Sequence, residues 1–327
     1  MGSNKVALNE FALIQQYFSS LGTASGIALG VGDDCAVLDV PEGEQLVVTV
    51  DTLVAGVHFP ANASPGDIAH RSLRVNLSDI AAMGAEPRWF TLALTLPEAR
   101  ESWLQEFSQA LSEDASIFGC ALVGGDTTAG PLSITIQLFG TVPKGKALTR
   151  SGAKAGDHIY VTGSLGEGAA ALFLFGRQDN SVVVEDERER LLHRFYRPKP
   201  RLLEGLRVRD LASAALDISD GLMADLGHIA EASGLGAEVE LDQLPIAPWL
   251  MALAAPSCVT EWALSGGDDY ELCFTVSEEH QVAVESLISR GELSACCIGQ
   301  MSRELGVRCV DRFGHLVNVG TAGYQHF

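Results

Sequence analysis

Aspartates beside glycine, or at the end of an apolar strand, recur along the whole chain. Rigid backbone at such positions holds a carboxylate in place, and glycine lets a ligand approach closely. Mg²⁺ prefers carboxylate oxygens, completed by water and phosphate oxygens. The series therefore predicts a site for metal ions and phosphate. Its members are Asp33 and Asp34 in GVGDDCAVL, Asp51 in LVVTVDTL, Asp79 in NLSDIAAMGA, Asp126 in LVGGDTTAG, Asp217 and Asp220 in LDISDGL, and Asp268 and Asp269 in LSGGDDYEL.

Any one of these motifs is also ordinary turn chemistry. Their recurrence in a chain without a phosphate-binding P-loop favours a functional site. Residues 140–146 have P-loop spacing up to the lysine, but Ala147 stands where a hydroxyl should hold Mg²⁺. We therefore expect a linker there. The GSLGEG segment, residues 163–168, lacks the spacing of a dinucleotide-binding loop and predicts a tight turn.

Other polar residues have two readings each. Ser72, Asn76 and Asp79 share one helical face, which is either a solvent-facing stripe or an edge that faces a ligand. Ser219 precedes a predicted helix, so it either caps the helix or helps its N-terminus hold a phosphate. His58 is a lone histidine, and such residues are more often structural than ligand-binding.

Composition excludes two classes of partner. The 327 residues include 42 Asp and Glu but 22 Lys and Arg, a formal net charge of −20. Such a surface repels nucleic acids and anionic membranes. No apolar stretch is long enough to span a membrane, and the first residues lack a signal-peptide pattern. Seven cysteines without a C-x-x-C pair favour a reduced, cytoplasmic protein.

The helices and strands predicted from the sequence indicate an α+β fold in two mixed domains. The Gly- and Lys-containing segment near residues 143–146 separates them, giving domains 1–145 and 146–327. Arg150 lies just past this boundary, where clefts tend to form, and an arginine there can pair with phosphate. Predicted helices cover residues 9–21, 64–84, 98–118, 168–175 and 221–233, and predicted strands 35–40, 45–53, 88–96, 121–124, 132–142, 158–162, 214–218, 237–241, 270–276 and 295–299.

The ordered motifs resemble those of the thiamine-monophosphate kinases, from about residue 10 to the end. The matching segments are GVGDDCAVL, VDTLVAGVHF, NLSDIAAMGAEP, GGDTTAGPLSITI, ALTRSGAKAGD, LDISDGL, SGGDDYELCF and GYQHF. This family belongs to the ATP-binding superfamily of aminoimidazole ribonucleotide synthetase. The resemblance implies a two-domain fold of that type, dimerisation through the N-terminal domain, and ATP-dependent phosphorylation of thiamine monophosphate with several Mg²⁺ ions.

The resemblance also implies roles for individual residues. It implies no catalytic residue beyond the metal and phosphate platform. The implied metal ligands are Asp34, Asp51, Asp79, Asp126, Asp217 and Asp220, with Thr49 and Val50 on a metal-holding strand and Val50 acting through its backbone. The implied nucleotide contacts are Gly125, Asp126, Arg150 and Ser219, and the implied substrate contacts are His58 and Asp268.

Two positions depart from the family pattern. The family motif GGEDYEL reads GGDDYEL here, so Asp268 is one methylene shorter than the usual glutamate. Where the family often has an aromatic residue that packs on thiamine, this chain has Thr321, and Tyr324 is the nearest aromatic side chain.

Four alternatives stay open. A selenophosphate synthetase needs a reactive cysteine beside an early lysine, but no cysteine neighbours Lys5. A hydrogenase-maturation dehydratase needs a C-terminal cysteine, whereas this chain ends in His326 and Phe327. A multi-metal phosphohydrolase would offer histidine ligands, and only His58 lies among the motifs. A Mg²⁺-nucleotide-binding regulator without turnover is the fourth.

Overall fold

The computed structural model describes residues 10–22, 24–176 and 185–319. The chain forms two compact units. The N-terminal unit comprises Met1–Asn76 and Pro87–Thr141, and the C-terminal unit comprises Leu77–Glu86 and Val142–Phe327. The expected boundary between residues 145 and 146 stays a prediction. No helix among the described residues has the length and apolar character that a membrane span requires.

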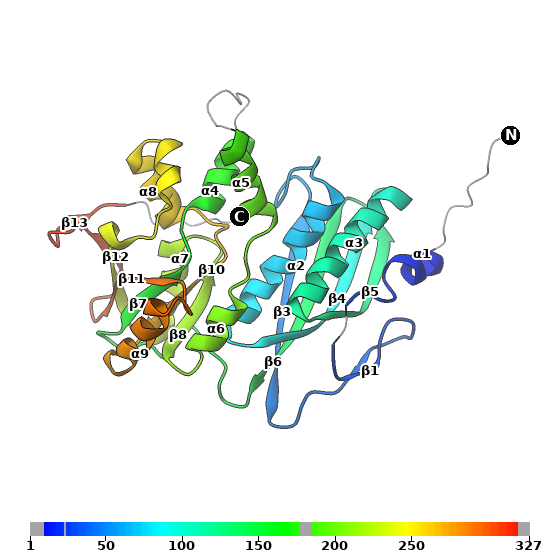
Figure 1. Cartoon of the computed structure of the whole chain (residues 1–327), viewed down its shortest axis with the longest axis horizontal. Helices are drawn as coiled ribbons and strands as arrows, with labels where there is room; N and C mark the ends of the chain where they lie inside the picture. Colours follow the sequence, from blue (N-terminus) through cyan, green and yellow to red (C-terminus); the bar gives the residue numbers. More distant parts are fainter. Residues whose placement is uncertain (1–9, 23, 177–184, 320–327) are drawn as a thin grey trace. The chain divides into compact units, whose positions relative to one another are not determined.

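The N-terminal unit is a four-stranded sheet in the order β3-β6-β4-β5, crossed by the helices α2 and α3 (Figure 1). Strands β4 and β5 are parallel. The elements are α1 (Glu10–Tyr17), β1 (Ile27–Leu29), β2 (Val37–Leu38), β3 (Glu44–Val54), α2 (Pro65–Ala82), β4 (Glu86–Leu96), α3 (Glu101–Phe118), β5 (Ala121–Ala129) and β6 (Ser133–Pro143).

Alternation along the strands explains why one face of this sheet is covered. On β6, Ile134, Ile136 and Leu138 are fully buried, while Gln137 between them is exposed. Helix α3 buries Leu104, Phe107 and Leu111 at the three- and four-residue spacing of a helical stripe. The neighbouring helix α2 begins directly after Ser64, as predicted. The Ser64 hydroxyl accepts the Asp67 N–H at 3.1 Å and so caps the helix.

Edge strand β3 differs from β6 because its outward side chains are also apolar. Leu46, Val48 and Val50 alternate along β3 and are 45%, 47% and 57% exposed. Contiguous apolar surface of this kind marks an association site more often than a solvent face. We call these three side chains the β3 apolar row.

The C-terminal unit is built on a seven-stranded sheet, counted over the described residues, in the order β13-β12-β9-β11-β7-β10-β8. Only the pairing of β12 with β9 is parallel among the pairings resolved in this sheet. The strands are β7 (His158–Thr162), β8 (Ala212–Ile218), β9 (Gly236–Glu240), β10 (Glu271–Val276), β11 (Ala295–Ser302), β12 (Gly306–Val310) and β13 (Leu316–Val317). The helices are α4 (Glu167–Gly176), α5 (Glu185–Tyr196), α6 (Leu202–Val208), α7 (Leu222–Ser233), α8 (Pro256–Ser265) and α9 (Glu278–Ser289), with short 3₁₀ turns at Leu241–Gln243 and Pro248–Ala252.

Both faces of this second sheet are buried. On β7, Ile159 and Val161 join a core with α7, while Tyr160 between them joins a second core with α6 and α9. Strand β10 is buried at all six positions. A sheet covered on both faces needs such continuous apolar runs.

The predicted α+β class is correct, and most predicted elements are present. Strand β7 has the predicted bounds. Of the linker expected at residues 140–146, residues 140–143 belong instead to strand β6, and residues 144–157 contain no helix or strand. The prediction ended β5 at residue 124, but it runs to Ala129, because pairing with β4 holds the GGDTT segment extended. Ser219 does not cap α7, since the N-cap position is Gly221 and no side-chain cap bond is formed there.

A buried ion pair joins α2 to α3. Arg74 donates from Nε and Nη2 to the two carboxylate oxygens of Asp114, each at 2.7 Å, and His70 lies 2.9 Å from the same group. Burial opposes ionisation of Asp114, but these bonds outweigh it and lower its pKa. The carboxylate therefore stays charged in the folded protein at neutral pH.

We expect Asp114→Asn to lower the free energy of unfolding by roughly 3 kcal/mol, because it leaves the Arg74 charge half-buried without its counter-ion. A folded-state pKa below the unfolded one stabilises the protein above the unfolded pKa, and this contribution disappears as pH falls through the folded pKa. Denaturant titrations at pH 7 and in acid should thus show a gap between wild type and variant that closes in acid. The neighbouring exposed Glu113→Gln is the control and should change stability by less than about 0.5 kcal/mol. An equal loss in both variants would contradict the assignment.

Candidate functional site

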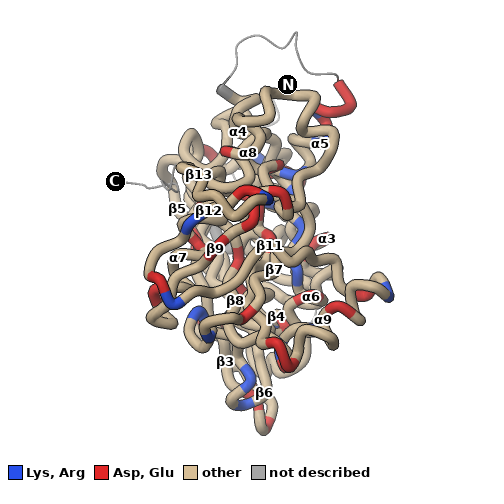
Figure 2. Tube along the Cα trace, turned by 90° about the vertical axis from the view of Figure 1, so that its left-hand side faces the viewer, with Lys and Arg blue, Asp and Glu red and all other residues tan. Residues whose placement is uncertain are grey.

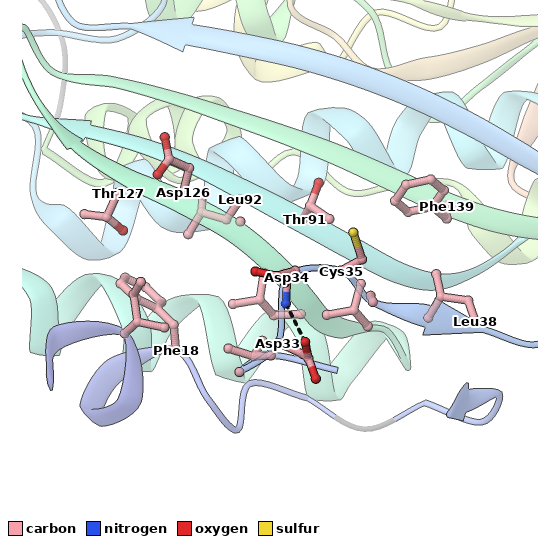
Figure 3. A pocket seen from close by; sticks show the side chains of 18 residues that line it. Phe18, Asp33, Asp34, Cys35, Leu38, Thr91, Leu92, Asp126, Thr127 and Phe139 are labelled. Carbon is pink, nitrogen blue, oxygen red and sulfur yellow. Dashed lines mark hydrogen bonds between the residues drawn. The ribbon is translucent and has the colours of Figure 1, made fainter. Parts of the chain in front are cut away.

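The N-terminal unit contains a cavity of about 720 Å³ lined by two of the aspartate motifs. This volume suits a nucleotide-sized ligand. Its carboxylates come from the loop before β2 and from β5, and Phe18, Thr91 and Phe139 contribute further walls. In the view of Figure 3, the Asp126 side chain on β5 and the Asp33 side chain in the loop before β2 point to opposite sides, and Asp34 lies between them. The predicted residues Asp34, Gly125 and Asp126 therefore line one cavity, together with Asp33.

Local backbone geometry sets up this cavity. The Asp33 side chain accepts the N–H of Asp34 at 2.8 Å and so closes the turn that carries both carboxylates. On β5, Gly125 pairs with Leu92 of β4, and Asp126 is the next residue. A Cβ at Gly125, where φ is +157°, would lie 2.0 Å from the Leu92 carbonyl oxygen. Only glycine fits there, which is why the motif needs it.

Strand β3 supplies the next predicted residues. Its period of two places Thr49 and Asp51 on one face and Val50 in the apolar row on the other. Val50 can therefore reach a metal on the face of Asp51 only through its backbone. Beyond the strand, His58 Nδ1 accepts the Val54 N–H at 3.0 Å. This bond fixes the proton of a neutral His58 ring on Nε2 and gives the ring a structural role in the turn.

In the C-terminal unit, Asp217 is the last residue but one of strand β8 and is 9% exposed. The Ser78 hydroxyl on α2 donates to its Oδ2 at 2.7 Å. Asp79 is the next residue of α2 and is half-buried. Earlier on α2, Ser72 and Asn76 are fully buried, so this face is not the solvent-facing stripe that the sequence allowed.

The loop after Asp217 is organised by a residue that sequence analysis missed. Asp225 on α7 accepts the N–H groups of residues 219, 220 and 221 on its Oδ2, at 3.0, 3.0 and 3.1 Å. Burial, together with the nearby Asp220 charge, raises its pKa to about 6, and the three N–H bonds oppose the rise. An acid in the first turn of a helix after an SDG loop was the available signal.

The GGDDYEL segment lies beside that loop. The Asp268 N–H donates to the Ser219 carbonyl and the Tyr270 N–H to the Ile218 carbonyl, each at 2.8 Å. Asp269 is fully buried and accepts the N–H groups of Gly166 and Gly168, so the GSLGEG turn packs on this segment. Burial raises the Asp269 pKa to about 7, against the opposing effects of Arg194 and the two N–H groups.

Two arginines bind the segment that contains Asp269 and Glu271. Arg201 donates to both oxygens of Glu271, and Arg194 donates to Glu271 and to the Asp269 carbonyl. Thr162 donates to the same glutamate at 2.6 Å. This network is buried, so it fixes the start of β10 and the GGDD turn before it.

The remaining predicted residues are not brought into these groups. Arg150 is exposed and lies in the chain segment that links strand β6 to strand β7. Thr321 and Tyr324 lie outside the described residues.

No set of three or more His, Cys, Asp or Glu side chains in the described ranges encloses a metal by itself. The available donors are nevertheless carboxylate oxygens, which suit Mg²⁺. This ion usually takes one or two carboxylates and completes its shell with water and phosphate.

The chain matches two family models, AIR synthase related protein, N-terminal domain, over residues 32–142 and its C-terminal domain over residues 154–311. It is 47% identical to the thiamine-monophosphate kinase of Escherichia coli over 98% of this chain and 99% of the other. The chain belongs to the thiamine-monophosphate kinase family.

Solved structures agree with this family. A thiamine-monophosphate kinase from Stenotrophomonas maltophilia superposes with a TM-score of 0.81 at 46% identity, over 87% of this chain and 91% of that one. A structure described as AaThiL complexed with AMPPCP and TMP superposes with a TM-score of 0.77 at 30% identity, over 88% and 89% of the two chains. The fold expected from the resemblance is thus confirmed as two AIR synthase-type domains.

Within this kinase family fold, the adjacent glycines of β5 offer a matched test. We expect Gly125→Ala to lower the melting temperature and abolish binding of an ATP analogue, because its Cβ collides with the Leu92 carbonyl. Gly124→Ala should keep the fold, since the nearest atom to its Cβ is a Thr91 methyl at 3.9 Å. Thermal unfolding and calorimetric titration of both variants measure this. Equal tolerance of both alanines would show that the β4–β5 geometry does not restrict residue 125.

Proposed function

We propose that this protein transfers the γ-phosphoryl group of ATP to thiamine monophosphate, giving thiamine diphosphate and ADP as the last step of thiamine diphosphate synthesis. The observation that carries the proposal is sequence identity of 46–47% to thiamine-monophosphate kinases over most of the chain. The relative bound to AMPPCP and TMP supports both substrates. This identity does not favour the alternatives of a selenophosphate synthetase-like enzyme or a regulator without turnover.

Mg²⁺ is the metal proposed for the reaction. In the N-terminal unit its ligands would be Asp34, Asp51 and Asp126, with backbone or side-chain oxygen from residues 49 and 50. In the C-terminal unit they would be Asp79, Asp217 and Asp220. When bound, the ions neutralise phosphate charge and hold donor and acceptor oxygens.

Charge explains why more than one ion is expected. ATP carries about four negative charges and a phosphate monoester nearly two near pH 7. Two like charges about 4 Å apart repel by roughly 4 kcal/mol at an effective dielectric near 20. Acidic residues outnumber basic ones in the chain, 42 to 22, and the red acidic segments are spread over the trace in Figure 2. One divalent ion cannot offset several such repulsions.

The chain itself contributes binding and orientation. Gly125 lets a nucleotide approach the β5 backbone, and Ser219 and Arg150 are proposed nucleotide contacts. Asp268 and His58 are proposed to contact thiamine monophosphate, a substrate whose thiazolium is cationic. The acceptor phosphate is already an anion at pH 7, so direct in-line transfer needs no strong general base.

A cytoplasmic homodimer is part of the proposal. The β3 apolar row belongs to the N-terminal unit, through which the family resemblance implies dimerisation. All seven cysteines, which lie within the described residues, are free thiols, as suits a reducing compartment.

Incubation with ATP, Mg²⁺ and thiamine monophosphate should yield thiamine diphosphate, measured by chromatography. Asp126→Asn and Asp79→Asn should each lower kcat at least 100-fold while the protein still unfolds cooperatively, because asparagine keeps the shape but loses the charge that binds Mg²⁺. A fold-retaining variant with near-normal rates at limiting Mg²⁺ would remove that residue from the metal set. Wild type that binds ATP but forms no product would favour a regulator.

Light scattering should give a mass near twice the chain mass of 34.7 kDa. Val48→Glu should shift the mass toward one chain, because it places a charge within the apolar row. Val282→Glu is the control, since Val282 on α9 is a 78% exposed valine outside that row. A wild-type mass near 35 kDa at micromolar concentration, or dimers in the Val48 variant, would exclude this interface.

A further inference from the structure

Three backbone turns of the C-terminal unit pack directly on one another. They are the GSLGEG turn at residues 163–168, the SDG loop at residues 219–221, and the GGDD turn at residues 266–269. A Cβ at Gly168 would lie 2.4 Å from the Asp268 carbonyl oxygen, and one at Gly267 would lie 2.3 Å from the Ser219 carbonyl oxygen. The GGDD turn is therefore held between the other two with backbone against backbone.

The middle turn has an unfavourable backbone. Asp268 has φ of +75° and Tyr270 has φ of +49°, a region that residues with a Cβ adopt rarely. Such conformations persist where the surroundings over-determine them. The Asp268 bond to Ser219 in the SDG loop and the Tyr270 bond to Ile218 at the end of β8, together with the Arg194 bond to the Asp269 carbonyl, supply part of that restraint.

Two buried aspartates brace the outer turns, one each. Asp269 is 0% exposed, and its Oδ2 and Oδ1 accept the Gly166 and Gly168 N–H groups at 2.8 and 3.0 Å. Asp225 is 4% exposed and accepts all three N–H groups of the SDG loop. Both carboxylates therefore hold backbone groups of these turns in place.

We propose that Asp269 and Asp225 are positioning residues with separate effects, Asp269 shaping the turn that binds thiamine monophosphate and Asp225 shaping the loop that binds nucleotide and metal. The division follows from what each one holds. Asp269 lies beside Asp268, the proposed substrate contact, whereas Asp225 holds Ser219 and Asp220, the proposed nucleotide and metal contacts. The assignment of ligands to the two loops rests on the proposed function.

Asparagine substitutions separate positioning from packing. In Asp269→Asn one acceptor oxygen remains for two N–H groups, and the amide NH₂ faces the second N–H. We expect the KM for thiamine monophosphate to rise about tenfold, the factor that corresponds to losing one buried hydrogen bond, and the KM for ATP to change less than twofold. In Asp225→Asn a neutral oxygen replaces a charged acceptor of three bonds. We expect the Mg²⁺ and ATP requirements to rise severalfold with the thiamine monophosphate KM unchanged.

Asp157→Asn is the matched control. Asp157 is a 4% exposed aspartate of the same unit that accepts the Lys154 N–H and the Ser213 hydroxyl, away from the three turns. It should lower the melting temperature without changing either KM. Gly168→Ala provides an independent displacement of the same turn and should reproduce the Asp269→Asn kinetics.

Steady-state kinetics with each substrate varied, beside thermal unfolding of every variant, decide the matter. Opposite selectivity of the two variants supports the proposal. Equal increases in both KM values for Asp269→Asn, or the same selectivity for Asp225→Asn, overturn it. If Asp269→Asn does not fold, the Gly168→Ala selectivity decides in the same way. Absence of thiamine diphosphate formation by the wild type would instead contradict the proposed function.

Discussion

Buried carboxylates that accept backbone N–H groups fix the loops that carry the candidate site residues of the C-terminal unit. Removing a carboxylate from water is costly, and burial accordingly raises the pKa of Asp225 to about 6 and of Asp269 to about 7. Two or three aligned N–H donors offset part of that cost. The same hydrogen bonds restrain the backbone of the loop that supplies the donors. In the N-terminal unit, Asp114 meets the same cost with Arg74 instead, and its pKa is lowered. Dipoles hold glycine-rich turns, while a full opposite charge holds two helices.

Aspartates in similar motifs of this acidic chain fall into two kinds, which differ in whether the carboxylate is exposed or is buried against backbone N–H groups. Asp34 and Asp126 are exposed in a cavity, where a ligand can reach their carboxylates. Asp225 and Asp269 are buried, and their carboxylates accept backbone N–H groups. Asp268 and Asp269 are adjacent in one motif and are both buried, at 9% and 0% exposed, and Asp268 has a positive φ. Spacing alone cannot separate these classes, because burial depends on which turns pack together.

The sequence predicted local structure well where the local signal was strong. Strand β7 follows from its continuous apolar run, and helix α2 from the Ser64 cap. It failed where distant segments decide the outcome. The GGDTT residues read as a turn, but β4 supplies hydrogen-bond partners that extend them as strand. Ser219 looked like a helix cap, whereas its loop is satisfied by Asp225 six residues later. In both cases the missing information was a tertiary partner for backbone groups.

Strand β3 shows how one element can link two properties. Its period of two places Thr49 and Asp51 on one face and the apolar row on the other, so a one-residue slip in register would exchange them. The hydrogen bond between the Thr52 and Thr135 hydroxyls, at 2.8 Å, ties β3 to β6 and opposes such a slip. Covering the apolar row would restrain the strand further, because β3 is an edge strand and pairs with a neighbouring strand, β6, on one side only. Association through this face would therefore also steady the backbone at residues 49–51. The proposed metal-holding face and the apolar row are two consequences of one register.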